Sequence, residues 1–436
     1  MSNMPFGFGM SDDPSKPGGF DMSSLGAALQ QLGQMMQSAS SGDQSGPVNW
    51  DMVRDLARKA IASSADPAPS DAQTRAVTAA LGMVDIWLDE AMTFPAIAVP
   101  GEAWSRAMWL ERTFPVWQRI VTPVAEQAAS MAGSMGGEAD LTNLDPAALM
   151  DSLPEQMRAM LPDGIPPEML ASLAPVMGIV QKLGAMAFSA QLGQALGALA
   201  REVLDSSDIG IPLTENALCA LLPDSIDQFA DGLGVSRDDA RAYLAARESA
   251  HQRLFAHVSW LRPRVIGAVE EYARGVRVNP ERMNELMTDI DISNPEALQE
   301  LLASGVLAPQ NTPEQEVAIT RLETLLALIE GWVDDVVDQA TSDKLPAAVS
   351  LRETMRRRRA AGGPAEKTFS TLVGMELRPK LLREASTLFA AARATYGAPA
   401  RDALWNHPDL LPSTEDLAEP LDFVARMADP ESFPDA

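Results

Sequence analysis

The sequence is poor in the residue types that carry most metal and nucleophilic chemistry. Cys219 is the only cysteine among 436 residues, and the only histidines are His251, His257 and His407. A single cysteine excludes an internal disulfide framework and is typical of a reducing compartment, so we expect a cytoplasmic protein. The first twenty residues also lack the apolar core of a secretory signal. Any histidine-dependent metal site must draw on the three histidine positions.

Basic and aromatic residues are also scarce. Lys and Arg number 34 against 60 Asp and Glu, which gives a net charge of −26, and aromatic residues make up 5% of the chain. The acidic surplus repels phosphate backbones and anionic lipids, so we expect neither a nucleic acid nor a membrane as partner. The most apolar stretch, residues 178–204, contains Lys182, Arg201 and Glu202, so we do not expect it to span a membrane.

The residues that are abundant favour helices. Apolar types make up 46% of the chain, with many Ala, Leu and Met, and they recur at spacings of three and four. We therefore predict a mainly α fold with few short strands. Residues 1–47, rich in Gly, Ser and Met, are expected to form a disordered arm. Residues 48–130 form an N-terminal helical region, residues 131–170 a Pro- and Gly-rich insertion or linker, and residues 171–436 a second helical region.

The middle of the chain contains two departures from an ordinary amphipathic pattern. Residues 176–204 predict a long helix in which Gly193 and Gly197 stand one turn apart. Small residues at this spacing allow two helices to approach closely, and we expect such a contact here. Residues 209–213, with the sequence IGIPL, are among the few that predict a strand.

Two predicted helices carry charged residues inside apolar stripes. The first begins near Ser236 and shows Arg247 and His251 in the centre of one otherwise apolar face. The second covers residues 313–340, is apolar over most of its surface, and contains Glu330 and Asp334. A buried charge is costly unless it is paired, so each helix must supply a partner for the other. We therefore predict that Glu330 lies beside Arg247, His251 or both.

The same two helices contain residue spacings that are known from zinc enzymes. Arg247, Glu248 and His251 belong to RESAH, which differs from HExxH only at its first residue. In the intact motif two histidines one turn apart bind zinc, and the glutamate activates the zinc-bound water. Glu330 and Asp334 give ExxxD, a spacing that suits a carboxylate ligand supported by a second carboxylate one turn away.

Five stretches of the chain resemble a zincin-like family of metalloproteases or hydrolases that is common in actinobacteria. Members are often described only as a domain of unknown function, and one branch is associated with synthesis of a deazaflavin cofactor. The resemblance extends over roughly residues 50–423. Its stretches are residues 48–62, 247–275, 328–338, 351–385 and 402–417.

The resemblance implies roles for individual residues. Glu248 would be the general base, His251 and Glu330 would be zinc ligands, and Asp334 would support them. Arg247 stands where the family motif has its first histidine, and a guanidinium has no lone pair to offer a metal. One hypothesis is therefore a zinc-dependent hydrolase acting on a peptide or protein. The other is a catalytically inactive zincin-like protein that acts as a binding module.

Two further motifs have nucleic-acid interpretations that we consider weaker. Residues 227–244 have the spacing of a helix-turn-helix, but Asp238 and Asp239 would then face phosphate. DNA binding is therefore a remote alternative. Residues 356–359 form a basic run, which in so acidic a chain predicts a helix end paired with nearby carboxylates.

The N-terminal arm provides a first test of the predicted boundaries. A truncated protein starting at Pro47 should keep its melting temperature within a few degrees of the full chain. Residues 1–47 lack the periodic apolar face that would offset the entropy lost on ordering. Thermal unfolding of the two proteins measures this, and a large drop in the truncated protein would show that the arm packs on the body.

Overall fold

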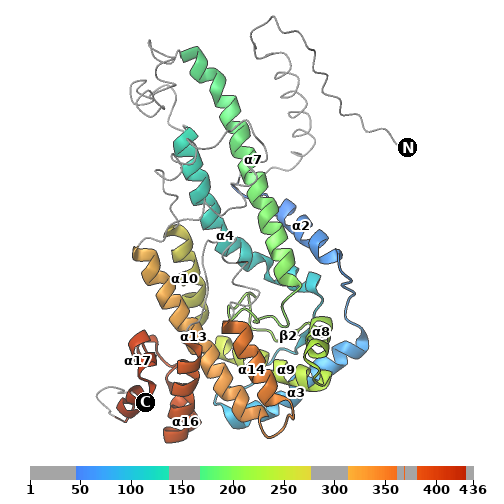
Figure 1. Ribbon diagram of the computed structural model, residues 1–436, viewed down its shortest axis with the longest axis vertical. Helices are drawn as coiled ribbons and strands as arrows, with labels where there is room; N and C mark the ends of the chain where they lie inside the picture. Colours follow the sequence, from blue (N-terminus) through green and yellow to red (C-terminus); the bar gives the residue numbers. More distant parts are fainter. Residues whose placement is uncertain (1–45, 137–166, 276–312, 361–367, 369–380, 429–436) are drawn as a thin grey trace, which may run out of the picture. The chain divides into compact units, whose positions relative to one another are not determined.

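The computed structural model describes residues 46–136, 167–275, 313–360, 368 and 381–428. Nearly all of these residues lie in helices, which confirms the mainly α fold (Figure 1). The predicted arm falls outside the described residues except at its last two positions. None of the described helices is long and apolar enough to cross a membrane.

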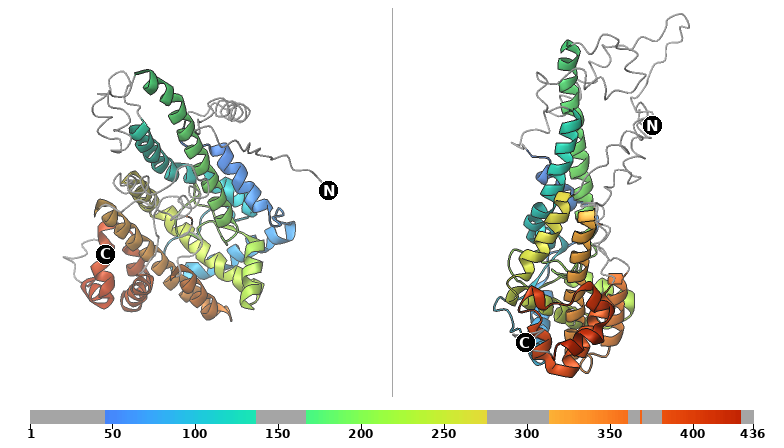
Figure 2. Two further views of the ribbon diagram at one scale, coloured as in Figure 1. Left: turned by 45° about the horizontal axis from the view of Figure 1, so that its top comes forward. Right: turned by 90° about the vertical axis from the view of Figure 1, so that its left-hand side faces the viewer.

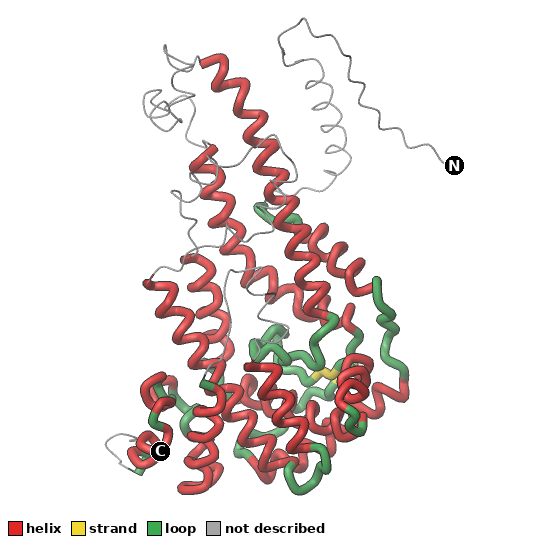
Figure 3. Tube along the Cα trace, viewed as in Figure 1, coloured by secondary structure: helices red, strands yellow, loops and turns green. Residues whose placement is uncertain are grey.

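The described elements are mostly helices, with two short strands among them. The helices are α2 (Trp50–Ala62), α3 (Asp71–Ala91), α4 (Arg106–Gly136), α7 (Pro167–Ala200), α8 (Pro223–Leu233), α9 (Arg237–His257), α10 (Leu261–Gly275), α13 (Pro313–Thr341), α14 (Ala348–Ala360), α16 (Leu382–Ala403), the 3-10 turn η1 (Pro408–Leu410), α17 (Thr414–Ala418) and α18 (Pro420–Arg426). Two short strands, β1 (Glu102–Ala103) and β2 (Ala220–Leu221), pair in parallel. Strands are coloured yellow in Figure 3.

Helix α9 lies at the centre of the packing around the site. The side chain of Ser236 accepts a hydrogen bond from the backbone of Asp239 and caps the helix start. Every residue from 242 to 255 is buried, because α3, α8, α13, α14 and β2 all pack against this helix. A helix that is buried on all sides cannot leave any polar side chain to water.

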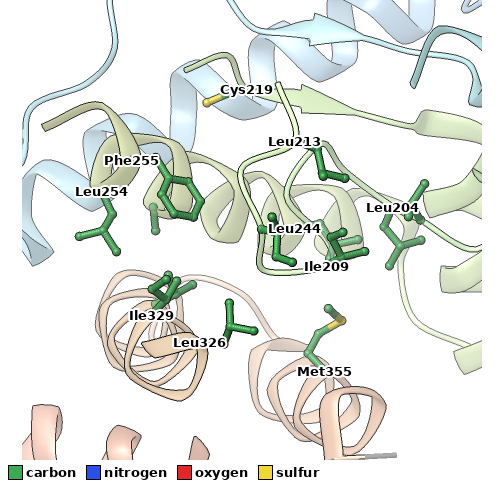
Figure 4. Packing of buried hydrophobic residues seen from close by; sticks show 14 of the residues in the cluster. Leu204, Ile209, Leu213, Cys219, Leu244, Leu254, Phe255, Leu326, Ile329 and Met355 are labelled. Atoms are coloured by element: carbon green, nitrogen blue, oxygen red, sulfur yellow. The ribbon is translucent and has the colours of Figure 1, made fainter. Parts of the chain in front are cut away.

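Apolar side chains fill the space between α9 and its neighbours. Figure 4 shows Leu326 and Ile329 of α13 facing Leu244 and Leu254 of α9, with Met355 of α14 beside them. This apolar contact packs α9 against α13 and α14. It also fixes the separation of the three helices that carry the polar residues of the site.

The close helix contact predicted from the glycine spacing is present between α7 and α2. A Cβ atom on Gly197 would lie 2.6 Å from the Cβ of Ala60 and 2.9 Å from the carbonyl oxygen of Ala57. A Cβ on Gly193 would lie 2.8 Å from the Cβ of Leu56. The absence of side chains at these two positions therefore allows the helix backbones to touch. Farther along, α7 packs against α4 (Figure 2).

The predicted strand at residues 209–213 is wrong. These residues form a turn and loop, in which the N–H of Gly210 donates to the carbonyl oxygen of Ser207 at 2.7 Å. Gly210 has a φ of 76°, a left-handed conformation that breaks an extended strand. The β-branched residues of this loop are buried against helices instead of pairing with a strand. Helices α4 and α7 also extend from both ends into the predicted insertion at 131–170.

The α2–α7 contact gives a prediction with a control on the same helix. Gly197→Ala should lower the free energy of unfolding by about 1–3 kcal/mol, because the new methyl group overpacks a backbone contact. Gly184→Ala, where nothing lies within 4 Å of the new atom, should be neutral or stabilise by about 0.5–1 kcal/mol. Urea unfolding of both variants measures the difference, and equal effects would show that the helices do not meet at Gly197.

Candidate functional site

The polar residues 247–253 of α9 point in three directions. Successive residues on a helix are about 100° apart, so residues four apart share a face. Arg247 and His251 face α13, where both contact Glu330. The other two faces meet the loop before β2 and helix α3. Each face therefore contacts a different part of the protein.

Glu330 of α13 is the common partner of the two residues on the first face of α9, and it is 2% exposed. Its Oε2 accepts from Arg247 Nη2 at 2.6 Å, and its Oε1 lies 3.1 Å from His251 Nε2. Arg359 Nη2 lies 2.8 Å from the same Oε1. The prediction that Glu330 meets Arg247, His251 or both is confirmed, since it meets both.

The charges around Glu330 determine its protonation. Burial by itself would raise the pKa of this carboxyl, but Arg359, His251 and Arg247 together hold it well below its usual range. Burial likewise opposes the charge on Arg247, yet Glu330 keeps the pKa of that guanidinium above its ordinary value. Glu330 and Arg247 therefore remain a charged pair inside the protein.

His251 is held at both ring nitrogens. Its Nδ1 lies 2.9 Å from the carbonyl oxygen of Arg247, and its Nε2 faces Glu330. An Nδ1 held by a backbone carbonyl is also the orientation that presents Nε2 to a metal in histidine-ligated sites.

Glu248 lies on the second face, against the loop before β2. Its carboxylate accepts from Ser206 Oγ at 2.5 Å, from Ser207 Oγ, from the N–H of Ala220 at 3.0 Å, and from Gln252 Nε2 at 3.3 Å. Burial raises its pKa despite these hydrogen bonds. The structure thus places the carboxylate of Glu248 on a different side of α9 from the Glu330 cluster.

Asp205 is a second buried carboxyl on this face, and the sequence analysis did not identify it. The N–H of Ser207 lies 3.1 Å from Asp205 Oδ1 and 3.2 Å from Glu248 Oε2, so it bridges the two acids. Burial, followed by repulsion from Glu248 and Asp208, raises the pKa of Asp205 well above its usual range. The neutral form of Asp205 is therefore favoured beside Glu248.

The third face of α9 anchors the helix to α3. Arg253 is fully buried and donates to Asp85 at 2.8 Å, to Asp89 at 2.6 Å and to the carbonyl oxygen of Phe94 at 3.1 Å. Ser249 also donates to Asp85, at 2.6 Å. These contacts fix the rotation of α9, and hence the direction in which Arg247 and His251 point.

Asp334 is close in sequence to Glu330 but has its own partners. It accepts from Arg352 at 2.7 Å, from Arg356 at 2.6 Å and from Ser386 Oγ at 2.7 Å. Burial opposes its charge, but these bonds keep the pKa of Asp334 below its ordinary value. The structure does not bring Asp334 into hydrogen-bond contact with Arg247 or His251.

The basic run at residues 356–359 pairs with nearby carboxylates, as predicted. Arg358 donates to Asp208 at 2.9 Å, and Arg359 reaches Glu330 from the last turn of α14. The sequence analysis missed the link from Arg359 to Glu330. The basic run indicated that carboxylate partners lie nearby. Which arginine pairs with which acid depends on how α14 crosses α13, and the sequence does not give that crossing.

The remaining histidines lie outside this site. His257 stacks on Phe94 with 6.2 Å between ring centroids and contacts the carbonyl oxygen of Pro95. His407 caps the 3-10 turn by accepting from the N–H of Asp409. Among the described residues, no group of three or more His, Cys, Asp or Glu side chains is placed to hold a metal ion.

The residues around Glu330 do not fit a zinc ion in this arrangement. His251 and Glu330 are suitable ligand types, but both carboxylate oxygens of Glu330 are already paired with guanidinium groups, one by a hydrogen bond and one by an ion pair. Arg247 and Arg359 supply positive charge and no lone pair. A metal ion would have to displace both guanidinium groups, against strong repulsion.

Comparison with known proteins supports the fold and gives the family. A family model described as zincin-like metallopeptidase matches residues 48–424. The chain belongs to this family. A crystal structure from Chloroflexus aurantiacus, named a "putative hydrolase with a novel fold", superposes with a TM-score of 0.59. It is 16% identical to this zincin-like protein, and the match covers 88% of this chain and 99% of the other, so it supports the fold alone. A search of curated proteins finds no match.

Glu330→Gln and Glu248→Gln should change the pH dependence of stability in opposite ways. The carboxyl groups have a pKa near 4.3 when unfolded. The folded pKa of Glu330 is lower, so its stabilising effect is present above about pH 4.3 and is lost as the pH falls. The folded pKa of Glu248 is higher, so its effect is present in acid and is lost as the pH rises through the folded value.

Urea unfolding between pH 3 and pH 8 measures these two effects. The stability gap between wild type and Glu330→Gln should shrink toward acid pH. The gap between wild type and Glu248→Gln should shrink toward neutral pH. Parallel curves for wild type and both variants would contradict the charge states inferred for these carboxyls.

Proposed function

We propose that this zincin-like protein acts by binding a partner, and that an ion-pair cluster takes the place of the family's zinc ion. One observation carries the proposal: both oxygens of Glu330 are paired with guanidinium groups, Oε2 by a hydrogen bond from Arg247 and Oε1 by an ion pair with Arg359. Arg247 stands four residues before His251, at the position of the first histidine in HExxH. In this interpretation RESAH is a degenerate zinc motif.

The cluster can replace the structural role of a metal. Arg247 and Arg359 together bring two positive charges, the charge of a zinc ion, to the carboxylate that would be its ligand. They come from α9 and α14, while Glu330 belongs to α13, so the contact joins three helices. The chemical role of zinc is different, because guanidinium groups cannot lower the pKa of a bound water as a Lewis acid does.

A peptide or protein is the partner class that the family assignment favours. Nucleic acid fits the structure poorly, because the arginines at residues 356–359 are engaged with carboxylates. Helix α9 would be the recognition helix of the alternative helix-turn-helix, yet it is buried from residue 242 to residue 255. A recognition helix must present exposed side chains to a groove.

A zinc-dependent hydrolase, most simply a peptidase, is the second candidate. It is favoured by the 3.1 Å separation between His251 Nε2 and Glu330 Oε1, which brings two expected zinc ligands together. In that mechanism Glu248 would be the general base and Asp334 would support the ligands. The hydrogen bonds that Glu248 accepts from Ser206 and Ser207 weigh against this role.

Arg247→His distinguishes the two functions. The variant removes a fixed charge that repels Zn²⁺ and adds an imidazole one turn from His251, which recreates HExxH. Breaking the buried pair with Glu330 should cost the metal-free variant about 3–5 kcal/mol. Zinc at a hundred times its Kd should then restore about 2.7 kcal/mol. The measurement is thermal unfolding of wild type and variant, each with zinc and with a chelator.

Arg247→Gln is the matched control, because it removes the same charge without adding a zinc ligand. We expect zinc to stabilise Arg247→His and to leave Arg247→Gln and wild type unchanged. If the wild type loses stability in chelator and contains zinc when purified without a histidine tag, the binding proposal fails. The protein would then belong with the working metallohydrolases.

A further inference from the structure

Helix α3 has one face that is open to solvent. Its buried side chains, among them Val77, Val84 and Leu88, lie on the side that packs against α9, α13 and β1. The opposite side is made of positions three and four apart, which share one face of a helix. All of these residues are exposed, and we call them the outer face of α3: Arg75, Ala79, Gly82, Met83, Ile86 and Glu90.

The centre of the outer face of α3 is apolar. Ile86 is 65% exposed and Met83 is 39% exposed, whereas most large apolar side chains of the described residues are buried. Gly82 lies beside them, and a Cβ on it would meet nothing within 4 Å. A glycine inside an exposed helix is less stable than an alanine, so helix formation does not explain this residue. A close approach of another backbone would explain it, as it does at Gly193 and Gly197 of α7.

Opposite charges stand at the two ends of the outer face of α3. Arg75 is exposed, and its guanidinium forms no ion pair with any described residue. Glu90 follows about four helical turns later, and its side chain is 73% exposed. Its Oε2 lies 3.2 Å from Lys344 Nζ, and its Oε1 has no partner among the described residues. Both ends of the face can therefore accept an ion pair from another molecule.

We propose that the outer face of α3 binds the same face of a second copy of this chain, with the two helices antiparallel. Such a contact has two-fold symmetry, so that when residue i meets residue j, residue j also meets residue i. The dyad would pass between Gly82 and Met83, and each of these would face the other. Ala79 comes opposite Ile86 in the same register. Each large apolar side chain of the face then meets a small residue.

The charges select this register. Positions 75 and 90 are equally far from the dyad, so Arg75 of each copy faces Glu90 of the other. Sliding one helix by three or four residues would set Arg75 opposite an uncharged residue. Exposed ion pairs contribute little energy, so they determine the register more than the affinity. The contact goes beyond the proposed function, since no residue of the outer face touches the Glu330 cluster.

The affinity of this contact should be low. A single pair of helices makes a small interface, and small interfaces belong to transient complexes. The net charge of −26 on each copy also opposes association, and salt screens this repulsion. We therefore expect a reversible dimer that forms at submillimolar protein concentration in physiological salt.

Sedimentation equilibrium of the full-length protein under these conditions tests the contact. Arg75→Glu and Glu90→Arg should each weaken the dimer severalfold, because each sets like charges opposite one another at both ends. Mixing the two variants should restore association as a heterodimer, because their charges are then opposite at both ends. Lys59→Glu, on an exposed residue of α2, makes the same charge change as Arg75→Glu and should leave the affinity near that of the wild type.

Cysteine cross-linking tests the register. Gly82→Cys should give a disulfide-linked dimer on oxidation with copper phenanthroline, because the two positions lie about 1.5 Å apart along the helix axis. Ala72→Cys, exposed on the same helix, would set its two thiols about 32 Å apart and should stay mostly uncross-linked. Cys219 is buried and should not react.

Four results would overturn the proposal. They are a wild type that stays monomeric at submillimolar concentration, no recovery when the two charge variants are mixed, an equal loss of affinity in Lys59→Glu, and equal cross-linking at the two cysteine positions. A monomeric wild type would mean that the outer face of α3 serves a different partner or none.

Discussion

The buried carboxylate of Glu330 is the contact on which the rest of the site depends. It holds Arg247 and His251 of α9 and Arg359 of α14 on one residue of α13. Without these cations, a charge this deeply buried would lose its hydration without compensation. Without Glu330, Arg247 and the Nε2 atom of His251 would lose their carboxylate partner. The three helices can therefore pack closely only because their charges meet at one point.

The same principle extends along α13. Asp335 pairs with Arg393 and Arg401 of α16, and Arg401 also reaches Asp402. Helix α16 can approach this closely because Gly331 has no side chain, and a Cβ there would lie 2.5 Å from the Cβ of Ala385. Many of the chain's few basic residues are thus used as internal links between helices. This explains how a strongly acidic protein can contain a basic run that is not a surface for nucleic acid.

The sequence predicted the meeting of Glu330 with Arg247 and His251 because charged residues inside apolar stripes require partners. It could not predict the all-round burial of α9, since a helix with many polar residues resembles a surface helix in sequence. The partners of Glu248 and the contact of Arg359 depend on the course of a loop and on a helix crossing. Neither is encoded by the local spacing of residues. The wrong strand prediction around Gly210 has the same cause. The apolar residues of this loop pack on helices, and local spacing does not encode that contact.

The relation between a zinc site and this ion-pair cluster follows from the atoms involved. Zinc binds through lone pairs, whereas a guanidinium binds through protons, and a carboxylate such as Glu330 can accept either. Exchanging one for the other preserves the charge balance and the packing of α9 against α13. It does not preserve the ability to polarise water, which needs an open metal position and a nearby base. Glu248 accepts several hydrogen bonds away from this point. Under the proposed function, the arrangement would keep the helix packing of a zincin-like site while a structural ion pair takes the place of the metal chemistry.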